Sequence, residues 1–203
     1  MKETPRNLII SALFNGRKGS RPPAGNPTSI VCHGLMDATG VDFPTAHLEA
    51  EAMAELALAG HEVLGFDVVM PEYSVHQEAA ALGCTTDWGD RNTMPDAKDA
   101  PYADFSDVEV PDNVLEKPSC RVVLEALSLL RREVGDHVAV FGKVMGPWTI
   151  SYHLAGTQNL LLKVGLGEGD KVVKMMRQVM GLTVAFANAQ FRAGADVVCL
   201  ADH

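Results

Sequence analysis

Apolar residues along this chain form short continuous runs that alternate with longer stretches of helical spacing. The short runs predict strands at residues 29–32, 63–70, 138–141 and 196–201. In these runs apolar residues follow one another without alternating with polar ones, which is typical of strands buried on both faces of a parallel sheet covered by helices. The pattern therefore predicts an α/β fold with about four strand–helix units.

Helices are predicted where apolar residues recur every three or four positions. Thr4 and Pro5 mark the start of the first helix, at residues 5–14. The others cover residues 45–59, ended by Gly60, residues 75–82, 119–133 and 170–193, and a short stretch through Tyr152. Residues 84–111 are polar and aperiodic, and such long loops more often serve a site than a core.

The alternation of strands and helices is compatible with a (β/α) barrel and with a doubly wound open sheet. No G-x-G-x-x-G motif follows the first predicted strand, so nothing in the sequence supports a dinucleotide-binding fold. In both architectures, sites form beyond the carboxyl ends of the strands.

Composition narrows the classes of function. The chain has 203 residues, 47% of them hydrophobic, and a net charge of -9 without any Lys- or Arg-rich run. A surface for nucleic-acid phosphates needs clustered cations, so we expect no nucleic-acid partner. No apolar span of 18 residues and no signal peptide is present, so we expect a cytoplasmic protein with no membrane contact.

The four cysteines are scattered and predict neither a disulfide framework nor a CxxC metal knuckle. Cys32, Cys120 and Cys199 lie in apolar runs, where a buried, reduced thiol is expected.

The rule of the strand ends selects a defined set of candidate site residues. They are His33, Met36 and Asp37 after the first strand, Glu72, Tyr73 and His76 after the second, Lys143, Met145 and Tyr152 after the third, and Asp202 and His203 after the fourth. Structural roles are also open: Glu72 can cap the following helix, and Lys143 can pair with an acidic neighbour. The remaining histidines, His47, His61, His137 and His153, are interpreted as surface or helix-face residues.

Asp202 and His203 are the sharpest pair among these candidates. A carboxylate and an imidazole are good zinc ligands, and they can equally form a hydrogen-bonded acid–base pair. Since two adjacent residues rarely reach one ion together, we expect at most one of them to bind metal.

A long stretch of the sequence without positive charges limits the kinds of substrate that the predicted site can bind. No Lys or Arg occurs between Arg21 and Arg91, so the first two strand-end loops offer no cation to a substrate with many carboxylates or phosphates. Apolar or neutral groups are therefore expected at the mouth of this half of the chain. Methionines near the strand ends suit a broad apolar ligand, although Met also fills gaps in cores.

Three segments resemble the uroporphyrinogen decarboxylase-like superfamily. They read LMDATGVDFPTAHLEAEAMAELALAGHEVLGFDVVMPEYSVHQEAAALGC, VFGKVMGPWTISYHLAG and GADVVCLADH. The resemblance covers nearly the whole chain and keeps the order of the motifs. It implies a (β/α)8 TIM barrel with its site at the carboxyl-terminal mouth. A closed barrel needs eight units, so residues 1–203 are expected to be the N-terminal part of one such domain.

Within the superfamily, the sequence is more similar to the corrinoid methyltransferases of the methylcobamide:coenzyme M type. True decarboxylases carry an Arg-rich stretch near the first strand, where this chain reads IVCHGLMDATG. The resemblance implies a methyl-corrinoid (methylcobamide, methylcobalamin-type) protein as partner and a small thiol such as coenzyme M as acceptor. It also implies zinc, whose main ligands, a His-x-Cys pair and a later Cys, lie beyond residue 203.

Asp202 matches the position where a carboxylate completes the zinc shell of this branch, whereas His203 departs from the more usual Pro. The expected function is thus a zinc-dependent methyltransferase. His33, Glu72, His76 and Tyr152 are the catalytic candidates, Met36, Tyr73, Lys143 and Met145 the substrate-binding ones, and Asp202 and His203 the metal candidates. Two alternatives stay open: a decarboxylase-like lyase acting on a tetrapyrrole, and a non-catalytic corrinoid-binding module.

Overall fold

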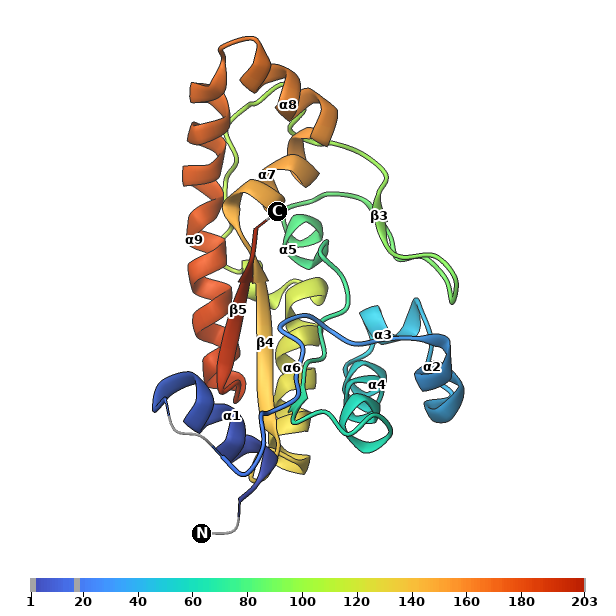
Figure 1. Ribbon diagram of the computed structural model, residues 1–203. Helices are drawn as coiled ribbons and strands as arrows, with labels where there is room; N and C mark the ends of the chain where they lie inside the picture. The colour runs from blue at the N-terminus through green and yellow to red at the C-terminus, as the bar shows by residue number, and fades with distance from the viewer. Residues whose placement is uncertain (1–2, 17–18, 203) are drawn as a thin grey trace.

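The computed structural model describes residues 3–16 and 19–202 and contains a parallel three-stranded sheet. Strand β1 (Val68–Val69) pairs with β4 (Ala139–Met145), and β4 pairs with β5 (Val197–Ala201), all in parallel. The order β1-β4-β5 follows the order along the chain, and β4 and β5 lie side by side in Figure 1. A parallel sheet in sequential order is the arrangement expected of a barrel segment, and within the described residues the sheet is not closed.

Three helices cover one face of this sheet. They are α4 (Ala50–Glu62), α6 (Pro118–Glu133) and α9 (Gly169–Ala193), which contact β1, β4 and both β4 and β5, respectively. Helix α1 (Pro5–Phe14) packs on β1 and β4 at the lower end of the sheet in Figure 1. The sequence prediction of α1 is confirmed, including Thr4 as its cap, whose Oγ1 accepts the N–H of Asn7 at 3.2 Å.

The side chains of the strands divide between two apolar clusters, which explains the uniformly apolar runs. Val138, Val140 and Val144 join the main core under α4, α6 and α9. Ile9 of α1 packs in a second cluster with Val68, Met70, Ala139 and Phe141. Both faces of β1 and β4 are therefore buried, as the sequence pattern predicts, whereas β5 is only partly buried.

Shorter elements gather mostly near the carboxyl ends of the strands. They are α2 (His33–Thr39), α3 (Thr45–Leu48), α5 (Gln77–Ala81), the 3-10 helix η1 (Val114–Glu116), α7 (Pro147–Ala155) and α8 (Thr157–Gly165). In Figure 1, α5, α7 and α8 lie at the end of the sheet marked C. The sequence analysis missed α8.

The predicted strand at residues 29–32 is wrong. This segment forms no strand, and Cys32 is the extended residue that precedes α2. A strand needs a neighbour with which to form a hydrogen-bonded ladder. Among the described residues, the backbone hydrogen bonds of this segment are those from Leu35 and Met36 to the carbonyl of Cys32. Cys32 is exposed, against expectation, whereas Cys120 is buried and Cys199 is partly buried.

Two further predictions need correction. The helix expected at residues 45–59 is interrupted at Glu49, whose backbone is extended, and its second part continues through Gly60 to Glu62. The irregular segment 84–111 contains a short antiparallel hairpin of β2 (Thr86–Asp87) and β3 (Asp96–Ala97). No helix in the described residues is long and apolar enough to cross a membrane.

Candidate active site

Polar side chains converge where β1 and β4 end. Glu72 and Tyr73 follow β1 within a few residues, and Lys143 and Met145 are among the last three residues of β4. All four are buried, with Glu72 0% and Lys143 3% exposed. Carboxyl ends of parallel strands meet at one edge of the sheet, so these groups lie at the position where sites form in this class of fold.

Around them lies a group of buried polar residues that we call the strand-end cluster. Its members are His47, Glu72, Tyr73, His76, Gln77, Glu78, Lys143 and His153. They come from α3, from the segment between β1 and α5, from α5 itself, from β4 and from α7. Segments far apart in the sequence therefore supply one set of polar groups.

Most of the cluster has no hydrogen-bond partner on its functional atoms among the described residues. Both oxygens of Glu72 and both ring nitrogens of His47 and of His76 are buried and unpaired. The Tyr73 hydroxyl, one oxygen each of Gln77 and Glu78, and Nε2 of His153 are in the same state. An unpaired buried polar group costs about 1–3 kcal/mol, so such a concentration favours a functional site over a packing role.

Glu78 ties the cluster to the end of the sheet. Its Oε1 accepts the backbone N–H of Met145 at 2.7 Å, and the Met145 carbonyl accepts the hydroxyl of Thr183 on α9 at 3.0 Å. Gln190 on α9 donates to the Lys143 carbonyl at 2.6 Å and lies over Gly142, where a Cβ would overlap its amide. The last residues of β4 are thus held from both α5 and α9.

The histidines of the cluster are neutral at physiological pH. Burial lowers the pKa of His47 to about 3, assisted by the nearby charges of Lys143 and His76. Burial likewise lowers the pKa of His153 to about 3 and lowers that of His76. The rings of His76 and His153 lie 4.1 Å apart between centroids, and His47 stacks on Phe43 at 4.0 Å. A neutral imidazole both donates and accepts, which suits proton transfer.

The pKa values of the two carboxyls in the cluster, Glu72 and Glu78, are raised, whereas those of the histidines are lowered. Burial raises the pKa of Glu72 well above its ordinary value, and the neighbouring Glu78 raises it further, while Lys143 acts against both effects. Burial raises the pKa of Glu78 to about 7, against the lowering effect of the Met145 N–H and of Lys143. Carboxyls that hold protons near neutral pH, beside neutral imidazoles, can perform acid–base chemistry.

The structure brings some predicted site residues together and leaves others apart. Glu72, Tyr73, His76 and Lys143 belong to the cluster, and Met145 is bonded to it. The Tyr152 ring lies next to the His153 ring of the cluster, tilted by 53°, with ring centroids 4.3 Å apart. Met36 is buried in the core, at 3% exposure. His33 is exposed at the start of α2, where its Nε2 lies 3.2 Å from the carbonyl of Arg91.

Asp202 has a local structural role. Its Oδ1 accepts the N–H of Thr149 in the first turn of α7 at 2.9 Å, and its carboxylate lies over Gly146, where any Cβ would overlap it. The carboxylate therefore caps α7, whose N-terminus favours negative charge. His203 lies outside the described residues.

Four residues of the cluster, His47, Gln77, Glu78 and His153, were not predicted from the sequence. His47 and His153 lie on the helices α3 and α7, but they are 0% and 9% exposed, so the surface interpretation is wrong. Glu78 stood among alanines in an ordinary helical pattern. One signal was present: Glu78 sits two residues beyond His76 in the same strand-end segment, and both follow Glu72 closely.

Metal ligands do not gather among the described residues, which contain no group of three His, Cys, Asp or Glu side chains able to hold an ion. These residues alone do not form a zinc shell. Asp202 remains one available carboxylate at the strand ends.

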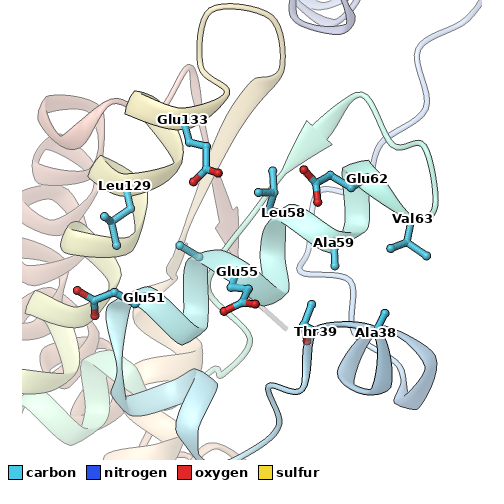
Figure 2. Close-up of a pocket in the computed structure, with 11 residues that line it drawn as sticks. Ala38, Thr39, Glu51, Glu55, Leu58, Ala59, Glu62, Val63, Leu129 and Glu133 are labelled. Atoms are coloured by element: carbon cyan, nitrogen blue, oxygen red, sulfur yellow. The ribbon is translucent and has the colours of Figure 1, made fainter.

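The structure also has an acidic groove of about 490 Å³ between α2, α4 and α6 (Figure 2). Glu51, Glu55, Glu62 and Glu133 line it together with small and apolar side chains. It contains no member of the strand-end cluster and no candidate site residue from the sequence.

Comparison with known proteins identifies the class to which this fold and strand-end site belong. The profile of the uroporphyrinogen decarboxylase (URO-D) family matches residues 4–203, so the chain belongs to that family. It is similar to the methylcobamide:CoM methyltransferase MtaA of Methanosarcina barkeri, with 30% identity over 203 residues, which is all of this chain and 60% of that protein.

Two other relatives point the same way. The methylated-thiol–coenzyme M methyltransferase of Methanosarcina mazei is 30% identical over 199 residues, covering 98% of this chain and 53% of that protein. A solved structure described as a methyltransferase from Methanosarcina mazei superposes with a TM-score of 0.92 at 30% identity, over 99% of this chain and 59% of the other. The chain thus spans about 60% of the length of MtaA and of the solved structure.

Proposed function

We propose that this chain belongs to a zinc-dependent methyltransferase that moves a methyl group between a methyl-corrinoid protein and a thiol such as coenzyme M. The observation that carries the proposal is the similarity to MtaA along the entire chain. The missing cations between Arg21 and Arg91 support it against a decarboxylase, which would bind a substrate with many carboxylates.

The proposal includes the architecture. Residues 1–203 are the N-terminal part of a single (β/α)8 barrel domain, in which β1, β4 and β5 are consecutive strands. Strand β5 has one paired side among the described residues, and Leu200 on it is 63% exposed. Further strands and helices of a barrel would cover this edge. The location we propose is the cytoplasm.

In the proposed reaction the acceptor sulfur forms a bond to the methyl carbon. The carbon–cobalt bond breaks, its electron pair stays on cobalt, and the thiol proton is released. Glu72, His76 and Tyr152 would act at the mouth, with Tyr73, Lys143 and Met145 contacting substrate. The proposed set also contains His33 as a catalytic residue and Met36 as a substrate-binding residue, both on the basis of the sequence alone. Asp202 and His203 would contribute to zinc binding, together with ligands outside this chain.

The test is demethylation of methylcobalamin by the whole protein with a thiol acceptor. We expect turnover that requires both zinc and thiol, detected by the change in the corrinoid absorption spectrum. Glu55→Gln, in the acidic groove, is the matched control and should leave the rate unchanged. Demethylation that requires neither zinc nor a thiol, or no demethylation at all, would contradict the proposal.

A decarboxylase is the second candidate because the family carries that name and the uroporphyrinogen decarboxylase of Alkalilimnicola ehrlichii is 28% identical over 178 residues. We expect no conversion of uroporphyrinogen to a less carboxylated product. Product analysis by chromatography decides between the two. If neither activity is found, but methylcobalamin binds, the non-catalytic corrinoid-binding module becomes the better description.

A further inference from the structure

Two acidic groups and one basic group of the strand-end cluster lie together away from water. Glu72 and Glu78 are 0% exposed and Lys143 is 3% exposed. Lys143 is the one Lys or Arg among the buried residues that the structure describes. The charge of Lys143 acts on both carboxyls, and Glu78 acts on Glu72. The three side chains therefore form one electrostatic unit.

Charge balance limits the protonation states of this unit. Two carboxylates and one ammonium would leave a net charge of -1 in a buried place, which is strongly unfavourable. No other buried cation is available to offset it, since the neighbouring His47 and His76 are held neutral by burial. Cys120 on α6 also faces the two carboxyls, and burial keeps its thiol protonated. Neutrality is reached when one carboxyl keeps its proton.

The hydrogen bonds assign different roles to the two carboxyls. Glu78 accepts the Met145 N–H at 2.7 Å through Oε1, an interaction that favours its ionised form. Neither oxygen of Glu72 has a partner among the described residues, so nothing but charge favours its ionisation. The proton is therefore expected on Glu72, and the negative charge on Glu78 between Lys143 and the end of β4.

We propose that Glu72, Glu78 and Lys143 form a single buried proton-binding site that is neutral because it holds one carboxyl proton, with Glu78 as the positioning residue that links it to β4. The ligand of the site is a proton. The proposal concerns the resting protein and does not depend on the methyl transfer proposed above.

Infrared spectroscopy of the whole protein, with glutamate labelled at the carboxyl carbon, tests this count of protons. The C=O stretch of a protonated carboxyl is separate from the carboxylate bands. At mildly alkaline pH, where exposed glutamates are ionised, we expect a band equivalent to one buried protonated carboxyl in the unmodified protein.

Three variants make the test specific. Glu72→Gln should abolish the band, because Lys143 then balances Glu78 alone. Lys143→Met should double it, because both carboxyls must then be neutral. The double variant Glu72→Gln/Lys143→Met should return it to the original intensity, which keeps the test open if Lys143→Met alone does not fold. Glu55→Gln, exposed on α4, is the control and should not change the band.

The proposal is overturned if the unmodified protein has no protonated carboxyl under these conditions. It is also overturned if folded Glu72→Gln keeps the band, if folded Lys143→Met has the same band intensity as the unmodified protein, or if the double variant has no band. Since no turnover is measured, a negative activity assay and a negative spectrum are separate results.

Discussion

The two ends of the sheet treat buried carboxyl groups in opposite ways. Before β1 and β5, at the amino ends, Asp67 and Asp196 are fully paired: Asp67 with Arg21 at 2.6 Å and the Ala24 N–H at 2.7 Å, and Asp196 with Arg6 and Arg131. At the carboxyl ends, Glu72 has no partner on either oxygen among the described residues.

This difference separates an end where carboxyls are ionised and paired from an end where carboxyls hold protons. Burial raises the pKa of Asp67, but the Arg21 guanidinium and the Ala24 N–H lower it more, so that the net shift is downward. Burial raises the pKa of Glu72 and Glu78, and their surroundings do not offset it. Carboxyls of the first kind stabilise the fold, whereas those of the second kind keep protons available. In barrels, chemistry belongs to the carboxyl ends of the strands and stability to the other end.

The largest expected effect is at the amino end. Asp196→Ala removes the partner of Arg6 and Arg131 and an acceptor of the Val140 N–H. We expect a loss of about 3 kcal/mol in the free energy of unfolding, the lower part of the range for a broken buried ion pair. The reason is that the Arg6 and Arg131 side chains are 31% and 33% exposed. Urea denaturation measures it.

The control for this change is Glu125→Ala, which breaks an exposed pair with Arg121 one helical turn away on α6. It should cost less than about 0.5 kcal/mol. Equal losses of unfolding free energy in the two variants would show that the ion pairs of Asp196 stabilise the fold no more than an exposed pair does.

The pH dependence of stability should have opposite signs at the two ends. The pKa of Glu78 is raised from 4.5 to about 7, so its protonated form stabilises the fold below the lower value and this contribution disappears as pH rises to the upper one. The expected loss is on the order of 3 kcal/mol. Asp67, with its lowered pKa, stabilises the fold above its ordinary value and loses that contribution as pH falls.

Glu78→Gln isolates the effect, since the amide oxygen still accepts the Met145 N–H and does not titrate. Denaturation curves collected from mildly acidic to neutral pH should be flatter for this variant than for the unmodified protein. A variant with the same slope would exclude Glu78 as the source.

Substitutions of Asp202 should have a smaller effect on stability, and this effect should differ between the Ala and the Asn variant. Asp202→Ala removes the cap of α7 and should cost about 1 kcal/mol in stability. Asp202→Asn keeps an oxygen for the Thr149 N–H and should keep most of the stability. If Asp202 is a zinc ligand, both variants should contain less zinc by elemental analysis of the whole protein. Unchanged metal content and rate in Asp202→Asn would remove Asp202 from the site, and His203→Ala tests the neighbouring position separately.

His33 should give the smallest change in stability. Its contact with the Arg91 carbonyl is exposed, so His33→Ala should cost only about 0.5 kcal/mol by thermal denaturation. As a proposed catalytic residue, its loss should slow methylcobalamin demethylation at least tenfold. A normal rate would exclude it from the mouth.

Much of the fold followed from the sequence because its signals are local. Helix α9 was predicted from residue 170 and begins at Gly169, and both end at Ala193, before Gly194 in the left-handed conformation. The break at Glu49 has no such signal, since no Gly or Pro marks it. There the chain turns His47 into the core, against Phe43.

The candidate site was predictable only in part, for a related reason. Glu72, His76 and Lys143 were found because the strand-end rule needs only the position of a strand. His47 and His153 could not be found in this way, because they lie on helices and their burial depends on distant segments. The Arg pairs of Asp67 and Asp196 equally join residues 46 and 190 positions apart.

By itself, the sequence determined the apolar strands β4 and β5, the helices that cover them and the family to which the chain belongs, because periodicity, caps and motif order are properties of neighbouring residues. Tertiary structure alone decided that residues 29–32 form no strand and that four segments bury His47, Glu72, Lys143 and His153 together. The physical reason is that ladder formation and burial depend on a partner, and the identity of that partner is not written in the segment itself.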